Sequence, residues 1–129
     1  MINVGIVGEA KETVNENNIA KTLRSGELNV YATPAMIALM EEVAYKSVAP
    51  ELEEGCGTVG TMMNIKHVAA TPVGMKVTCE TELVKVDGRA LTFSVKAYDE
   101  CGLIGEGEHE RFIVDDVKFQ SKANGKLNK

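Results

Sequence analysis

The clearest pattern along the chain is a helical one that begins at Thr33-Pro34. Proline is favoured at the first helical position and threonine just before it, so Thr33 is predicted to be the N-cap residue. No further proline occurs before Pro50, which leaves room for a helix of about 17 residues, or ~25 Å at ~1.5 Å per residue. One broad arc of this helix is apolar except for one serine, which is typical of a helix packed against a sheet. That arc contains Met36, Ile37, Leu39, Met40, Val43, Ala44, Ser47 and Val48.

After the helix, the period of the apolar positions changes from 3.6 to 2, which predicts strands. We expect four of them, over residues 59–69, 75–83, 91–97 and 104–114, with Asp87-Gly88 as a tight type I′ hairpin turn between the second and the third. In the last strand, Glu106, Glu108 and Glu110 alternate with inward-facing residues. In the first strand, one face is expected to carry Val59, Thr61, Met63, Ile65, His67 and Ala69.

Two segments complete the chain before and after these elements. We expect a first strand over residues 4–15. Residues 15–27 are expected to form an irregular loop that leads toward the helix, here called the approach loop, with room for one helical turn. A strand, a long helix and four antiparallel strands form an α+β layer design, in which one helix packs on a curled antiparallel sheet. This is the arrangement of the hotdog fold. We therefore expect a single hotdog domain over residues 1–119, followed by a flexible, basic tail over residues 120–129.

Composition narrows the function classes. The 129 residues correspond to one domain, and 14 Lys and Arg against 19 Asp and Glu give a net charge of −5, which argues against binding a nucleic-acid backbone. No cationic segment precedes the apolar residues at the N-terminus, and no run approaches the ~18 apolar residues of a membrane span, so we expect a cytoplasmic protein. Cys56, Cys79 and Cys101 fit neither a disulfide framework nor a zinc knuckle, and we expect them to be reduced.

Two adjacent glutamates on the helix should have different surroundings, because they lie ~100° apart around its axis. Glu42 precedes Lys46 by four residues on the polar side, which predicts a surface ion pair. Glu41 lies at the border of the apolar arc. A carboxylate at that place is either solvated at its tip or borders a cleft, where partial burial would suit it to act as a base.

Three other side chains could take part in chemistry, and each also has an ordinary structural role. His67 lies on the apolar face of its strand, where it is either a packed core residue or a proton carrier. His109 lies on the inner face of the last strand beside Gly105 and Gly107, whose missing side chains leave room for an approaching group. Thr33, besides capping the helix, places a hydroxyl at the positive end of the helix dipole.

Several common site types are absent from the sequence. Two histidines without a nearby cysteine ligand argue against a catalytic metal. There is no phosphate-binding loop, no dinucleotide fingerprint and no nucleophile elbow, which makes kinases, Rossmann dehydrogenases and α/β-hydrolases poor candidates.

Taken together, several short runs resemble the fluoroacetyl-CoA thioesterase family of hotdog thioesterases, over about residues 28 to 119. The runs are Tyr31-Ala32-Thr33-Pro34-Ala35-Met36, Leu39-Met40-Glu41, Gly60-Thr61, His67-Val68-Ala69-Ala70-Thr71-Pro72-Val73-Gly74 and His109-Glu110-Arg111. The resemblance implies a catalytic triad of Thr33, Glu41 and His67. It also implies that the backbone N–H of Gly60 contacts the thioester carbonyl, and it places His109 and Arg111 with Gly60 among the substrate-binding residues.

The reaction implied by this resemblance is acyl-CoA hydrolysis. Glu41 either attacks the thioester carbonyl or activates water, His67 moves the proton, and Thr33 orients Glu41 through a hydrogen bond. Coenzyme A is then part of the substrate, and neither a bound cofactor nor a metal is required. We also expect a homodimer, because two sheets with open edges can join edge to edge and complete each site from both chains.

One segment departs from the family, and two other functions stay open. The family's fluoroacetyl enzyme has phenylalanines before the helix, whereas residues 24–30 have none, which leaves the acyl group open within small and medium acyl chains. A hotdog hydratase would need an aspartate and a histidine at the loop that enters the helix, and residues 31–37 contain neither. A non-catalytic protein that binds acyl-CoA or another small ligand is the stronger alternative.

Overall fold

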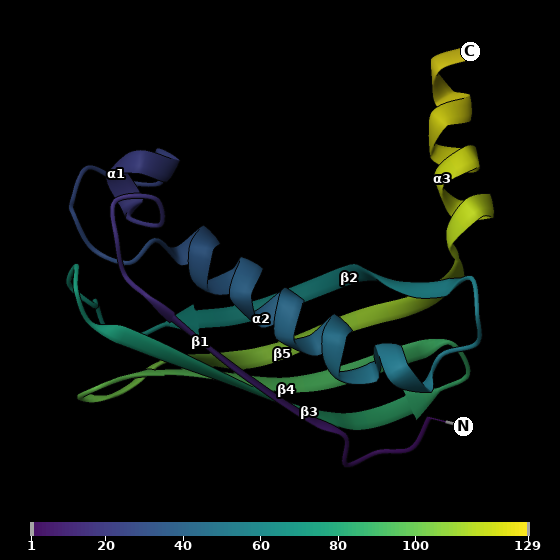
Figure 1. The fold of residues 1–129 in the computed structure, drawn as a ribbon, viewed down its shortest axis with the longest axis horizontal. Coiled ribbons are helices and arrows are strands. Elements are labelled where there is room, and N and C mark those ends of the chain that lie inside the picture. The colour runs from purple at the N-terminus through teal and green to yellow at the C-terminus, as the bar shows by residue number, and fades with distance from the viewer. Residues whose placement is uncertain (1, 129) are drawn as a thin grey trace.

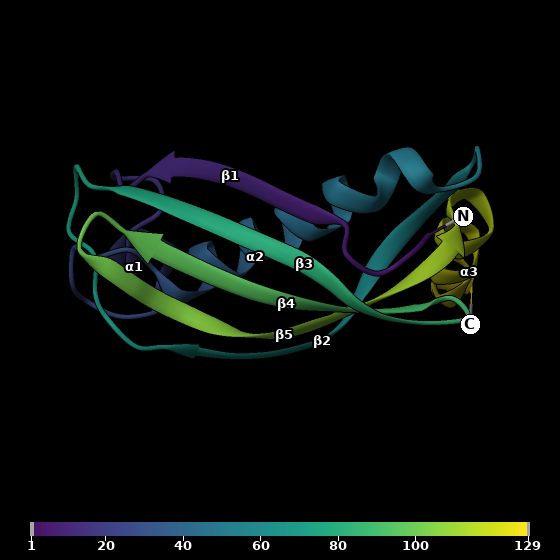
Figure 2. The ribbon, with the colours of Figure 1, turned by 90° about the horizontal axis from the view of Figure 1, so that it is seen from below.

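The computed structural model describes residues 2–128, which form one antiparallel sheet with a long helix on one face. Helix α2 (Thr33–Val48) lies along the strands, and the sheet curls around it (Figures 1 and 2). The strand order is β1-β3-β4-β5-β2, so β1 and β2 form the two edges. The strands are β1 (Val7–Thr13), β2 (Cys56–His67), β3 (Lys76–Asp87), β4 (Ala90–Asp99) and β5 (Gly102–Asp115). The predicted succession of strand, helix and four antiparallel strands is confirmed.

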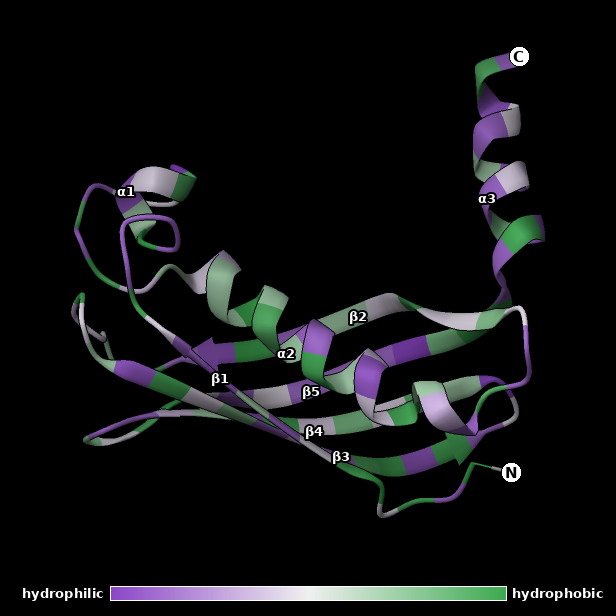
Figure 3. Cartoon of the chain, in the orientation of Figure 1, coloured by the Kyte–Doolittle hydropathy of each residue, from purple (hydrophilic) through white to green (hydrophobic). Residues whose placement is uncertain are grey.

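The core lies between α2 and the inner face of the sheet. Apolar residues gather on α2 and on the central strands (Figure 3). The predicted apolar arc is confirmed, with Ile37 and Ser47 half-buried at its margins and Ala35 as an additional buried residue. The helix lies so close to the sheet that a Cβ added to Gly105 would be 2.6 Å from Sδ of Met36. Complete burial of the Met36 side chain stabilises the fold by about 1.5–3 kcal/mol. This burial is possible because Gly105 has no side chain to clash with Met36.

The start of α2 differs from the prediction in one respect. The N-cap residue is Ala32, not Thr33, and it makes no side-chain capping hydrogen bond. The backbone carbonyl of Ala32 already accepts the first helical hydrogen bond, from the N–H of Met36 at 3.0 Å, so Thr33 is the first helical residue. The hydroxyl of Thr33 is therefore not used for capping and can reach another partner.

Strand β2 also differs from the prediction, because its alternation is interrupted. Its pairing with β5 shifts between Gly60 and Met62, and Thr61 is the extra residue of a β-bulge. Residues directly opposite in a ladder share a face, and Val59 lies opposite the exposed Phe112, whereas Met63 lies opposite the buried His109. The prediction of a single shared face was therefore wrong for Val59 and Thr61. Ala69 lies beyond the end of the strand.

The hairpin between β3 and β4 is present, but its turn is displaced by one residue. Asp87 pairs with Ala90, so the two loop residues are Gly88 and Arg89 rather than Asp87 and Gly88. Gly88 has φ +62°, whereas Arg89 is not among the residues with positive φ. A glycine with positive φ at the first loop position alone is the pattern of a type II′ turn, not of the predicted type I′.

Short helical segments connect and extend these elements. The approach loop contains the single turn α1 (Ala20–Leu23), and Pro50 lies in the 3₁₀ turn η1 (Ala49–Glu51) that follows α2. After β5, the chain forms α3 (Asp116–Asn124) and the 3₁₀ turn η2 (Gly125–Asn128), which project away from the sheet (Figure 1).

The sequence predicts a tail without regular structure after residue 119, but the structure has a helix there. Asp115 caps this helix by accepting a hydrogen bond from the N–H of Lys118 at 3.0 Å, so a local signal starts it. None of the residues of α3 is buried, as the polar composition predicted. The flexibility of this segment in solution stays a prediction.

Candidate active site

The first group of site residues joins the start of α2 to the end of β2. Oγ1 of Thr33 lies 2.7 Å from Nδ1 of His67. The other ring nitrogen, Nε2 of His67, is buried and has no hydrogen-bond partner among the described residues. An open hollow of about 300 Å³ lies beside this pair, lined also by the approach loop and by residues 68–70. His67 therefore has one nitrogen held by Thr33 and one nitrogen that is buried without a partner within residues 2–128.

The second group lies about two turns further along α2, around Glu41. Its side chain is 44% exposed, and Oε2 lies 3.6 Å from a terminal guanidinium nitrogen (Nη1) of Arg111. Glu42 instead pairs with Lys46 at 2.6 Å on the outer side of the helix, which confirms the predicted difference between the two glutamates. Glu41 is thus a half-exposed carboxylate beside a buried cation.

Arg111 is held in place by several contacts at once. Nε donates to Oγ1 of Thr58 and Nη2 donates to the carbonyl of Thr58, both at 2.8 Å. Nη1 lies 3.1 Å from Nε2 of His109, and the guanidinium carbon lies 5.7 Å from the ring centre of Tyr45. The side chain of Arg111 is only 7% exposed, so the guanidinium is rigidly placed and poorly hydrated.

Gly60 forms the floor of this second group. A Cβ added to Gly60 would lie 2.8 Å from Oε2 of Glu41, 3.3 Å from Cε1 of His109 and 3.4 Å from Nη1 of Arg111. Only a residue without a side chain lets the carboxylate lie this close to the strand. The structure therefore brings four of the six candidate residues, namely Gly60, Glu41, His109 and Arg111, to one place on the inner face.

The predicted hydrogen bond between Thr33 and Glu41 is not formed among the described residues. The two residues are eight positions apart on one helix, which separates them by ~12 Å along its axis at ~1.5 Å per residue. The hydroxyl of Thr33 bonds to His67 instead. Within one chain the six candidates thus form two groups, Thr33 with His67 and Glu41 with its neighbours.

Two residues of the site were missed from the sequence. Thr58 provides two of the acceptors of Arg111, and Tyr45 packs its ring against the guanidinium. A signal for them existed, because Arg111 falls on the inner face two residues after His109, and a buried arginine needs acceptors on the neighbouring strand.

Both histidines are partly shielded from water, which lowers their pKa values. Burial is the main cause for His67, and the backbone of Ala69 acts in the opposite direction. Burial is also the main cause for His109, to which the charge of Arg111 adds, whereas the hydrogen bond to Met62 and the charge of Glu41 raise its pKa. Both imidazoles are therefore neutral at neutral pH.

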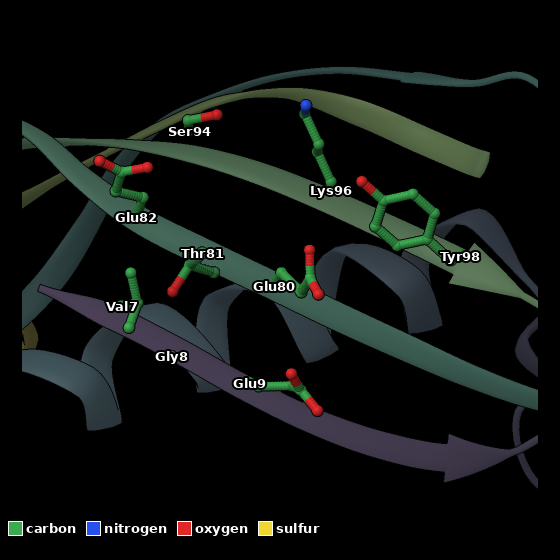
Figure 4. A pocket seen from close by; sticks show the side chains of 9 residues that line it. All are labelled: Val7, Gly8, Glu9, Glu80, Thr81, Glu82, Ser94, Lys96 and Tyr98. Carbon is green, nitrogen blue, oxygen red and sulfur yellow. The ribbon is translucent and has the colours of Figure 1, made fainter. Parts of the chain in front are cut away.

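Metal-ligand clusters and other hollows bear on what else residues 2–128 could bind. Among residues 2–128, no group of three His, Cys, Asp or Glu side chains could hold a metal ion, and no helix is long and apolar enough to cross a membrane. A separate hollow of about 560 Å³ lies on the opposite face of the sheet (Figure 4). Its charged lining consists of Glu9, Glu80 and Glu82 with Lys96, which would repel an anionic ligand.

The lowered histidine pKa values predict how stability depends on pH. Above the ordinary histidine pKa of 6.5, the folded and the unfolded chain both hold these rings neutral. Below it, the unfolded chain binds protons more readily than the folded chain, so the free energy of unfolding should decrease as the pH is lowered through the ordinary histidine pKa of 6.5. Urea unfolding at several pH values measures this. His109→Gln should weaken the dependence, and an unchanged dependence would contradict the assignment.

Comparisons with known proteins agree with this geometry. A family model described as fluoroacetyl-CoA-specific thioesterase matches residues 14–117. The fluoroacetyl-CoA thioesterase of Streptantibioticus cattleyicolor is 43% identical over 97 residues, which are 75% of this chain and 70% of that protein.

Solved structures show the same architecture. The structure of the fluoroacetyl-CoA thioesterase FlK has a TM-score of 0.92 at 35% identity and covers 98% of both chains, and a variant of FlK has been solved in complex with acetyl-CoA. A hot-dog-like protein from Thermanaerovibrio acidaminovorans has a TM-score of 0.87 at 25% identity, over 95% of this chain and 91% of that one. The predicted hotdog fold is confirmed, and the chain belongs to the fluoroacetyl-CoA-specific thioesterase family.

Proposed function

We propose that this chain is an acyl-CoA thioesterase that hydrolyses small or medium acyl thioesters at the Glu41 group. The observation that carries the proposal is the half-exposed carboxylate of Glu41, which lies over Gly60 and beside the fixed cation of Arg111. Family membership and the acyl-CoA chemistry of the relatives support it. Coenzyme A enters and leaves as part of the substrate.

The chemistry needs a polarised carbonyl, an attacking oxygen and a proton donor for the leaving thiolate. In one route, Glu41 removes a proton from water, the water oxygen attacks the carbonyl carbon, and the C–S bond breaks. In the other, a carboxylate oxygen of Glu41 attacks first, and water then hydrolyses the resulting anhydride. In both routes the neutral ring of His67 accepts at Nε2 the proton that water releases, by way of Glu41 in the first route, and passes it to the thiolate sulfur, while Thr33 holds Nδ1.

The separation of the two groups supports a dimeric site. Strand β2 is an edge strand of 12 residues with a single lysine, whereas the other edge, β1, has three charged residues in seven. A long edge with few charges favours pairing with another strand. Two copies joined antiparallel along β2 would bring the end of one β2, with the partner's His67, toward the start of the other. Each Glu41 would then face a histidine across the interface.

A dimer is therefore expected in solution. Light scattering at micromolar concentration should give twice the 13.9 kDa mass of one chain. A stable monomer that still hydrolyses acyl-CoA would contradict the composite site.

The proposed catalytic residues are tested by substitution. Glu41→Ala and His67→Ala should each lower kcat/KM by at least ~10²-fold, because each removes a group that acts on the reacting atoms. Release of free thiol from a panel of acyl-CoA esters, followed with a thiol reagent, measures this. Glu42→Ala is the matched control, since Glu42 pairs with Lys46 at the surface, and it should change little. No thiol release by the wild-type chain would instead favour a non-catalytic binding protein.

Selectivity for the acyl group should be modest. The segment of residues 24–30 is mostly exposed and contains no aromatic side chain that could line a small pocket. One small substituent in a loosely walled site is worth only ~1–3 kcal/mol, so kcat/KM for fluoroacetyl-CoA should exceed that for acetyl-CoA by less than ~10³-fold. Steady-state kinetics on the two substrates measure the ratio. A larger preference would show that other residues form a selective pocket.

The proposed cellular location rests on the cysteines. We place the protein in the cytoplasm, where thiols stay reduced, and the three cysteines are all free in the structure.

A further inference from the structure

His109 is buried in the middle of the sheet and has no surface through which a substrate could touch it. Its side chain is 1% exposed and stacks on Phe93 of the neighbouring strand, with ring centres 6.1 Å apart. Yet both ring nitrogens are in polar contact, which is more than packing alone requires. Nδ1 lies 2.9 Å from the carbonyl of Met62, and Nε2 lies 3.1 Å from Nη1 of Arg111.

These two contacts define one protonation state of the ring. A carbonyl only accepts hydrogen bonds, so Nδ1 must carry a hydrogen that it donates to Met62. An arginine only donates, so Nε2 must be the unprotonated acceptor for Arg111. A second ring proton would put two N–H groups against each other. The contacts therefore fit only the neutral Nδ1–H tautomer of His109.

The other acceptors of Arg111 are neutral as well. Thr58 provides a hydroxyl and a carbonyl, and His109 provides an imidazole nitrogen. Among the described residues, the one carboxylate that forms an ion pair with this guanidinium is that of Glu41. The arginine is thus oriented by groups that do not neutralise it, and its charge stays available to Glu41.

We propose that His109 is a positioning residue of this thioesterase, which holds the guanidinium of Arg111 beside Glu41 without cancelling its positive charge. The β-bulge of β2 contributes, because it interrupts the ladder next to Met62, where a side chain takes up the carbonyl. The proposal rests on the proposed function in one respect, namely that Glu41 acts in hydrolysis.

Two substitutions separate the two ring nitrogens. In His109→Gln, the amide oxygen can take the place of Nε2 and accept from Arg111, while the bond to Met62 is lost. In His109→Asn, the amide N–H can take the place of Nδ1 and donate to Met62, while the acceptor for Arg111 is lost. Both variants are of similar polarity, so they differ mainly in which contact survives.

The proposal predicts that only the contact with Arg111 matters for activity. His109→Asn should lower kcat by at least ~10-fold with KM changed less than ~3-fold, whereas His109→Gln should stay within ~3-fold of the wild type. Thermal unfolding of each variant monitors the fold. Phe93→Leu serves as a control that weakens the packing of the same ring, and it should lower the unfolding temperature with little change in kcat.

A double-mutant cycle shows whether His109 acts through Arg111. With Arg111→Met already present, His109→Asn should change kcat by less than about twofold, since methionine has no N–H group to donate to His109. Equal losses in His109→Gln and His109→Asn, or a full loss on the Arg111→Met background, would overturn the proposal. If His109→Asn does not fold, the comparison of His109→Gln with the wild type still decides, because a loss above ~10-fold in a folded His109→Gln contradicts it. Inactivity of the wild type would instead defeat the proposed function.

Discussion

The close approach of α2 to the sheet is the constraint on which the rest of the structure depends. At three places along its length, a helix side chain lies directly against a glycine of the sheet. A Cβ would meet Met36 at Gly105, Glu41 at Gly60, and Val43 together with Ser47 at Gly8, all at 3.0 Å or less. Moving the helix away from the sheet would expose its buried apolar residues. Glu41 is therefore held close to the backbone of β2. The carboxylate that we propose to be catalytic is therefore positioned by core packing.

The second requirement is electrostatic. Burying a guanidinium is unfavourable unless its N–H groups find acceptors, and breaking such a network is costly because it leaves a buried charge without partners. Thr58 and His109 meet this requirement from the two strands that flank the site. Since these acceptors are neutral, the favourable charge interaction is concentrated on one half-exposed carboxylate. Glu42, one residue further on, lies on the outer side of the helix and pairs there with Lys46.

Much of the fold could be predicted from the sequence, because the helix and most strands have strong periodic patterns. The apolar arc placed Glu41 at the border of the core, and alternation placed His109 on the inner face. The bulge at Thr61 could not be predicted, since one extra residue leaves the local alternation of side chains intact on either side. The same is true of the helix start, because a threonine before proline suits both an N-cap and a first helical position. The network around Arg111 depends on strand pairing, which no local pattern contains.

In the proposed site, the reacting carbonyl lies above Gly60, between Glu41 and Nε2 of the partner's His67. A crystal structure with an acetyl-CoA analogue, in which a methylene group replaces the thioester sulfur, tests this most directly because the carbonyl is kept and cannot be cleaved. The carbonyl carbon should lie within about 3.5 Å of a carboxylate oxygen of Glu41, or of a water molecule that is hydrogen-bonded to Glu41, because attack begins from that separation. An analogue bound with its carbonyl elsewhere, such as in the hollow on the opposite face of the sheet, would contradict the account.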